Sequence, residues 1–172
     1  SIRSRDVTIG ICLRGQQDEY GPENCLHRET KSMALKAAER IVSERGGRIT
    51  FIDNHLKRSA MSPPQIIDRY AECDLVITSR YHGAMIALRQ QVPFIAIDQI
   101  RGGTKVYNLI KSIPWPHLYK ADQIDSETIL ASANEILEKH DTDILLQMKR
   151  DVVRSALSSL NQLEKEIRHL VG

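Results

Sequence analysis

Short apolar runs alternate with amphipathic segments along almost the whole chain. Four runs rich in β-branched residues have the length and composition of strands that are buried on both faces. They span residues 7–13, 48–52, 74–78 and 94–97. Between and after these runs, apolar residues recur every three or four positions, which predicts helices. The helices are expected over residues 30–45, from 62 through Tyr70, over about nine residues after 83, over 104–110, from 125 or 126 through 137, and from 143 to near the end.

The order of these elements defines the fold class. A strand, a polar turn, a short helix and a second strand occupy residues 74–98, which is a βαβ unit with a right-handed crossover and parallel strands. A short fifth strand is expected within residues 115–119 at the sheet edge. The sequence therefore predicts one α/β domain over residues 1–172, a doubly wound, Rossmann-like parallel sheet of about five strands with helices on both faces.

The last predicted helix, over residues 143–171, is longer than a domain of this size needs. About 28 residues at 1.5 Å per residue give a length of about 42 Å. Its apolar positions form a continuous stripe: Leu145, Met148, Val152, Ala156, Leu160, Leu163, Ile167 and Leu170. We expect the far end to pack on a partner domain or on another copy of the chain, as a homo-oligomer.

Composition excludes several classes of function. The net charge is +2 from 24 basic and 22 acidic residues that are interspersed, so a nucleic-acid partner is not expected. No apolar run approaches the roughly 20 residues of a membrane span. Three widely spaced cysteines fit a reduced, cytoplasmic protein. Cys25 and His27 have half of a metal-site spacing, but nothing supplies the other half, so no metal is predicted.

Polar residues with anion-binding chemistry follow the predicted strands. Arg14 follows the first strand, Arg80 and His82 follow the third, and the turn 102–104 (Gly-Gly-Thr) follows the fourth. Because the carboxyl ends of parallel strands share one sheet edge, these groups should converge there. Guanidinium groups match carboxylate and phosphate, and a helix start adds positive charge and N–H donors. The pattern predicts a site for a small dianion.

Structural interpretations of the same residues remain open at this stage. Arg80 could form a surface salt bridge, His82 could cap its helix, and the two glycines could form only a flexible turn. Residues 53–55 fit turn chemistry equally well. The polar loop 15–29 is either a binding loop or a surface excursion, and Asp74 and Asp98 are expected to serve turns and caps.

The segments 79–84 (SRYHGA) and 92–97 (VPFIAI), with the short helix between them, resemble the S-R-x-H-(G/A) signature of the polysaccharide pyruvyl transferase family. Lys105 falls where that family often carries a lysine, and a weaker match extends from Val7 to about Ile113. The resemblance implies the C-terminal, donor-binding half of a two-domain GT-B-like enzyme. Such enzymes transfer the enolpyruvyl unit of phosphoenolpyruvate to two hydroxyls of a sugar as a ketal.

Roles for individual residues follow from this resemblance. Arg14 and Arg80 would bind the phosphate and carboxylate of phosphoenolpyruvate, and His82 would act as a general acid or stabilise the leaving phosphate. Further contacts to the donor would come from Ser79, Gly102, Gly103, Thr104 and Lys105. No cofactor or metal is implied. The acceptor would be a saccharide of a cell-surface polysaccharide or exopolysaccharide, free or lipid-linked, which would place the enzyme in the cytoplasm, either free or at the inner membrane face.

Two other functions remain open. A GT-B glycosyltransferase or epimerase domain would bind a sugar nucleotide at the same edge, with Asp98 and Tyr81 as the only candidates for ribose and base contacts. A non-catalytic binding or assembly module would explain the long terminal helix. Because the acceptor-binding half and its general base are missing, the chain alone could be inactive.

Overall fold

The computed structural model describes residues 6–54, 61–139 and 142–171. A five-stranded sheet forms its centre, with every neighbouring pair of strands parallel and the order β2-β1-β3-β4-β5. The strands are β1 (Val7–Cys12), β2 (Gly47–Phe51), β3 (Leu75–Thr78), β4 (Phe94–Asp98) and β5 (Leu118–Lys120). The predicted α/β, Rossmann-like fold with five parallel strands is confirmed.

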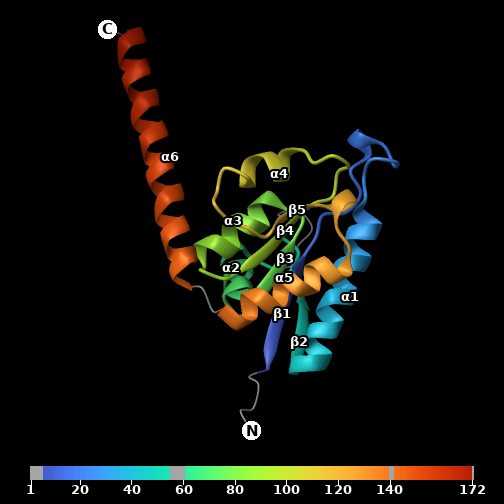
Figure 1. Ribbon diagram of the computed structural model, residues 1–172. Coiled ribbons are helices and arrows are strands. Elements are labelled where there is room, and N and C mark those ends of the chain that lie inside the picture. Colours follow the sequence, from blue (N-terminus) through green and yellow to red (C-terminus); the bar gives the residue numbers. More distant parts are fainter. Residues whose placement is uncertain (1–5, 55–60, 140–141, 172) are drawn as a thin grey trace.

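Helices cover both faces of this sheet (Figure 1). The helices are α1 (His27–Arg45), α2 (Pro63–Ala71), α3 (Tyr81–Arg89), α4 (Lys105–Ile110), α5 (Ser126–Lys139) and α6 (Thr142–Val171). Helices α1 and α5 pack against each other on one face, whereas α2 and α3 pack on the other. Strands β3 and β4 between these layers are buried at every position, as their apolar sequences predict.

Local sequence signals explain the helix boundaries. The predicted capping box is present at α2, where the Ser62 N–H donates to Gln65 Oε1 at 2.8 Å. Asp125 caps α5, because its Oδ1 accepts the Thr128 N–H at 2.8 Å. The predicted break before α6 at residues 140–142 lies partly outside the described residues.

Helix α1 begins at His27, one turn earlier than the periodicity predicts. The cause is tertiary, because the Leu26 N–H donates to the Gln99 carbonyl at 2.8 Å and Cys25 pairs with Ile100 in an isolated antiparallel bridge. The polar loop before α1 is correspondingly shorter than predicted. It also contains a short 3-10 helix, η1 (Asp18–Tyr20).

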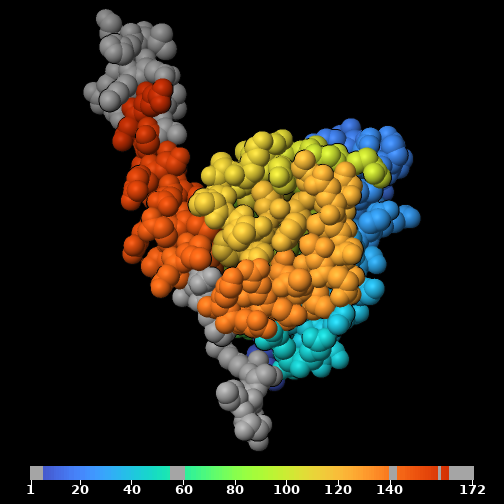
Figure 2. Space-filling model, viewed as in Figure 1, coloured from blue at the N-terminus to red at the C-terminus, as the bar shows by residue number. Residues whose placement is uncertain are grey.

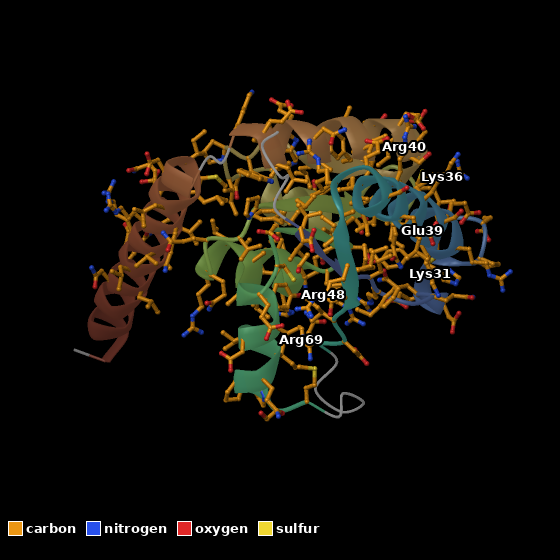
Figure 3. All side chains as sticks on the ribbon, turned by 90° about the horizontal axis from the view of Figure 1, so that it is seen from below. Lys31, Lys36, Glu39, Arg40, Arg48 and Arg69 are labelled. Atoms are coloured by element: carbon orange, nitrogen blue, oxygen red, sulfur yellow. The ribbon has the colours of Figure 1, made fainter. Side chains whose placement is uncertain are left out.

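The outer surface of α1 carries charges of both signs. Figure 3 shows Lys31, Lys36, Glu39 and Arg40 pointing away from the sheet. Arg40 pairs with Glu44 at 2.9 Å and reaches Glu127 of α5 at 3.1 Å. This mixed pattern is typical of a solvated surface.

Helix α6 leaves the body of the domain after packing on α3 (Figures 1 and 2). Leu145 and Met148 of the predicted stripe are buried in the core. Farther along, Val153, Leu157 and Leu160 are 51%, 55% and 61% exposed. The stripe positions Leu163, Ile167 and Leu170 have side chains outside the described set. That this face packs on a partner domain or subunit stays a prediction.

Strand β5 is held to β4 by a buried aromatic corner. The Trp115 indole stacks on Phe94 with ring centroids 5.1 Å apart and donates to the Phe94 carbonyl at 2.7 Å. His117 lies edge-on to Trp115 with ring centroids 5.4 Å apart and is 6% exposed. Its buried Nδ1 has no hydrogen-bond partner among the described residues. Burial lowers the pKa of His117; nearby Glu135 raises it and Lys139 lowers it by smaller amounts.

We therefore expect acid to destabilise the domain through His117. The ordinary pKa is 6.5 and the folded pKa is lower, so below about pH 6.5 the unfolded chain binds a proton that the folded chain excludes. The free energy of unfolding should fall from there until the folded pKa is passed. Urea unfolding between about pH 7.5 and 5 should show a smaller fall for His117→Leu than for the wild type. Identical pH dependence of both proteins would contradict the assignment.

Candidate active site

Strand order places a cleft between the carboxyl ends of β1 and β3. The chain passes from β1 to β2 on one side and then crosses back to β3 on the other, so β1 and β3 flank the point where the winding reverses. Open α/β sheets bind ligands at this point. A cleft of about 870 Å³ lies there.

Strand register brings the two predicted arginines to the same level. Cys12 of β1 pairs with Thr78 of β3, and Arg14 and Arg80 each follow two residues later. Two hydrogen bonds join the strand ends: the Arg14 N–H donates to Ser79 Oγ at 2.7 Å, and Arg80 Nε donates to the Leu13 carbonyl at 3.3 Å. The backbone of Arg14 and the side chain of Arg80 are therefore held at one edge of the sheet.

Most of the predicted site residues line this cleft. They are Arg14, Ser79, Arg80, His82, Thr104 and Lys105. Gly102 and Gly103 do not line it, although their positive φ of 78° for each explains why glycine occupies this turn. The structure thus brings the residues together; their roles toward a substrate stay predictions.

The glycine turn differs from its predicted chemistry. The Gly102 N–H donates to Asp122 Oδ2 at 3.0 Å and the Gly103 N–H to the Ile100 carbonyl at 2.8 Å. Asp98, 1% exposed, accepts the N–H groups of Thr104 at 2.7 Å and Tyr107 at 2.9 Å. The amides expected to bind an external anion are therefore already satisfied, and Asp98 caps the start of α4 as the sequence suggested.

The first backbone amides of helix α3, unlike those of α4, are not bound by a side chain of the described residues. Its N-cap is Arg80, which provides no side-chain cap, and its first amides at Tyr81 and His82 have no acceptor among the described residues. Thr78 Oγ1 instead accepts the Arg80 N–H at 3.0 Å, which fixes the approach to the helix. An uncapped helix start carries partial positive charge and unsatisfied donors. Of the two helix starts at this cleft, α3 is the one that can receive an anion.

The Arg80 guanidinium retains its charge for a ligand. Among the described residues no carboxylate forms an ion pair with it. Its buried neighbours, Cys12 and Tyr70, stay neutral, because burial raises the pKa of each group more than Arg80 lowers it. The half-buried cation is thus held by a carbonyl and not neutralised.

Arg14 has an acidic neighbour within the cleft. Its Nη2 lies 3.6 Å from Glu19 Oε1, and both side chains are more than half exposed. The pKa of Glu19 is lowered by its own backbone amide, by the Gln17 side chain and by Arg14, so the carboxylate is ionised at neutral pH. A bound anion would therefore compete with Glu19 for Arg14.

Several cleft residues were missed by the sequence-based prediction. They are Gln17, Glu19, Tyr20, Arg89 and Gln99 on the polar side, together with an apolar wall from Pro63, Ile66, Ile67, Met85, Ile86, Val106 and Leu109. Tyr81, which the sequence suggested only as a base contact for a sugar nucleotide, and Asn54, which turn chemistry explained equally well, also line the cleft. Placement directly after a strand could have identified Gln99. His55 lies outside the described residues.

The sequence predicted no metal ion at Cys25 and His27, which have only half of a metal-site spacing. Cys25 Sγ is buried and accepts the Gln17 N–H at 3.3 Å. Among the described residues, no group of three His, Cys, Asp or Glu side chains is arranged to hold a metal ion.

No helix of the described residues has both the length and the apolarity needed to cross a membrane.

Comparison with known families supports the resemblance found in the sequence. The model of the family "Polysaccharide pyruvyl transferase" matches residues 25–99, which include β3, the Arg80–His82 turn and α3. This segment of the chain is therefore similar to the polysaccharide pyruvyl transferases. No curated protein matches the chain.

The fold is similar to one part of solved GT-B glycosyltransferases. The spinosyn rhamnosyltransferase SpnG complexed with thymidine diphosphate matches 92% of this chain with a TM-score of 0.57 and 15% sequence identity. A glycosyltransferase of kitacinnamycin matches 94% with a TM-score of 0.58 and 10% identity. The chain spans 46% and 43% of these two proteins, less than half of either.

The close packing of α3 on β3 gives a direct test of the site. A Cβ at Gly83 would collide with Thr78 Oγ1 and approach the Tyr70 hydroxyl to 3.1 Å. Gly83→Ala should therefore cost about 1–3 kcal/mol of stability and displace the start of α3. Chemical denaturation of this variant measures the cost. Gly15→Ala is the matched control, because a Cβ at Gly15 meets no atom within 4 Å and should change stability little; equal stability of the two variants would contradict the packing.

Proposed function

We propose that this chain is the donor-binding half of a polysaccharide pyruvyl transferase, and that its cleft binds phosphoenolpyruvate. The observation that carries the proposal is the Arg80 guanidinium, which pairs with no carboxylate of the described residues. It lies beside the start of α3, which has no side-chain cap among the same residues, at the reversal point of the sheet. The family match over residues 25–99 supports it. Arg14, across the strand pair, would bind the second anionic group of the donor.

The charge balance of the cleft suits this donor. Arg14, Arg80, Arg89 and Lys105 line it against two carboxylates, Glu19 and Asp98. Asp98 is already bound to the backbone of α4, so only Glu19 opposes the cations. Phosphoenolpyruvate carries a phosphate and a carboxylate, the two groups that arginine side chains recognise best.

The reaction would be a group transfer without net redox change. One sugar hydroxyl oxygen bonds to C2 of phosphoenolpyruvate while C3 gains a proton to become a methyl group. The bond between C2 and the phosphate oxygen breaks, and the second hydroxyl closes the ketal. Of the two hydroxyl protons, one balances the methyl group and the other the released phosphate. His82, exposed at the α3 start, would protonate C3 or stabilise the departing phosphate.

The remaining parts of the enzyme would lie outside this chain. The saccharide acceptor, free or lipid-linked, and the base that deprotonates it would be bound by an N-terminal domain. The exposed apolar positions of α6 suit contact with that domain, or with a second copy of the chain. Cytoplasmic location, free or at the inner membrane face, belongs to the same proposal.

A sugar-nucleotide site is the second candidate. The thymidine diphosphate complex of SpnG has the same fold, and the cleft of about 870 Å³ has an apolar wall as well as a cationic side. The argument against it is that Asp98, the carboxylate the sequence offers for the ribose, is already bound to the backbone of α4.

Replacement of Arg80 tests the donor site. Isothermal titration with phosphoenolpyruvate should show binding to the wild-type chain and an affinity about 10- to 100-fold lower for Arg80→Ala, because a charge-assisted fork is lost. Arg80→Lys should be intermediate, since it keeps the charge without the planar fork. Thermal melting of each variant separates this loss from unfolding. Tight binding of UDP-glucose or thymidine diphosphate, with none of phosphoenolpyruvate, would favour the second candidate.

Replacement of Glu19 is expected to strengthen phosphoenolpyruvate binding. Removing its charge frees Arg14, so Glu19→Gln should bind phosphoenolpyruvate about two- to fivefold more tightly at neutral pH, the range expected for an exposed ion pair. Titrations at low and high salt should show that the gain shrinks as salt screens the pair. A weaker affinity in this variant would mean that Glu19 itself takes part in binding.

A further inference from the structure

Gln99 is a buried residue that lines the cleft beside Ser79. It follows β4 and is 1% exposed. Its Oε1 accepts the Ser79 hydroxyl at 2.9 Å, and its Nε2 donates to the Gly15 carbonyl at 2.8 Å and to Gln17 Oε1 at 3.2 Å. Nε2 also lies 3.6 Å from Cys25 Sγ. One side chain thus connects the loops that follow β1, β3 and β4.

These contacts determine which way the carboxamide faces. The Gly15 carbonyl can only accept, so the group next to it must be the amide nitrogen. The oxygen then faces Ser79, whose hydroxyl donates to it while accepting the Arg14 N–H at 2.7 Å. The hydrogen-bonding capacity of Gln99 is filled, with both N–H groups and the carbonyl used inside the protein.

The network leads to the two ends of the loop between β1 and α1. At the first end, Gln99 reaches Arg14 through Ser79 and holds Gly15 directly. At the second end, the backbone carbonyl of Gln99 accepts the Leu26 N–H at 2.8 Å. The loop carries Arg14, Gln17 and Glu19 into the cleft, so its position sets where the Arg14 charge lies relative to Arg80.

Packing alone does not explain a glutamine at this place. Burying a carboxamide costs free energy unless every polar atom is paired, and an apolar side chain of similar size would avoid that cost. A fully satisfied buried polar group fixes one arrangement of the segments around it. Here the segments are the three strand ends that carry the candidate anion ligands.

We propose that Gln99 is a positioning residue for the anion site: it holds the β1–α1 loop so that Arg14 and Arg80 act on one ligand together. The inference rests on the proposed anion-binding function of the cleft. It assigns Gln99 no contact with the reacting atoms. Its effect on binding should therefore be transmitted through Arg14 and should vanish when the Arg14 side chain is removed.

A double-mutant cycle measures this dependence. Wild type, Gln99→Met, Arg14→Ala and the double variant are titrated calorimetrically with sulfate and with phosphoenolpyruvate. We expect Gln99→Met to weaken anion binding about tenfold in the wild-type background and less than about twofold in the Arg14→Ala background, because contacts within one network are not additive. The loss of thermal stability caused by Gln99→Met should be the same in both backgrounds.

A matched control separates positioning from general destabilisation. Ser132 is also buried, and its hydroxyl lies 2.6 Å from the Tyr119 hydroxyl on the α5 side of the sheet. Ser132→Ala removes a buried hydrogen bond far from the loop, so it should lower thermal stability without changing anion affinity. Equal losses from Gln99→Met in both backgrounds, or no loss in either, would overturn the role of Gln99.

Failure of the proposed function has a different signature. If the wild-type chain binds neither anion, the anion site itself is wrong, and with it the positioning role. If the wild type binds and the cycle shows no coupling, only the role of Gln99 is wrong. Amide hydrogen exchange provides a readout without ligand: the Arg14 N–H should exchange about tenfold faster in Gln99→Met than in wild type, and unchanged exchange would also contradict the proposal.

Discussion

The parallel pairing of β1 with β3 is the constraint on which the rest of the site depends. The pairing sets Cys12 opposite Thr78, and the strands then end together. Residues two positions beyond each end must therefore lie side by side, which is how two arginines 66 positions apart share one edge. Because the sheet reverses its winding between these strands, no crossover helix covers the space above them. The cleft follows from topology, and its cationic character from what stands at the strand ends.

Two helix starts face this cleft, and the protein uses them in opposite ways. At α4, the buried Asp98 carboxylate already binds two backbone amides, so the helix dipole is satisfied internally. At α3, the N-cap is an arginine, and the first amides are left for another acceptor. The Asp98 carboxylate offsets the partial positive charge at the start of α4, whereas Arg80 adds to that at the start of α3. The positive potential of the cleft is therefore expected to be highest around Arg80 and His82.

The exposed apolar residues of α6 are compatible with the proposal that this chain is one part of a larger enzyme. Among the described side chains of α6, Leu145 and Met148 are buried and Val152 packs partly against the core, whereas Val153, Leu157 and Leu160 are exposed. Solved glycosyltransferases of the same fold are about twice as long as this chain. The donor-binding proposal accommodates both facts, because it assigns the acceptor site to a second domain.

Local signals in the sequence determined most of the fold. Buried β-branched runs, the capping box at Ser62 and the cap at Asp125 depend on neighbours within a few residues, so periodicity and turn chemistry were sufficient to predict them. The Arg80 and His82 positions were also predictable, because any residue after a parallel strand lies at the ligand-binding edge.

Tertiary structure decided which backbone amides at this edge remain available to a ligand. The glycine turn lost its predicted anion-binding amides to Asp122, Ile100 and Asp98, and the start of α1 moved because residues near Gln99 hold it. The Gly102–Asp122 and Leu26–Gln99 hydrogen bonds join residues far apart in the chain, so their partners are set by strand register and helix packing, which no local pattern encodes. The bonds of Gly103 to Ile100 and of Thr104 to Asp98 are local, and of these the sequence suggested only the role of Asp98 in a turn or cap.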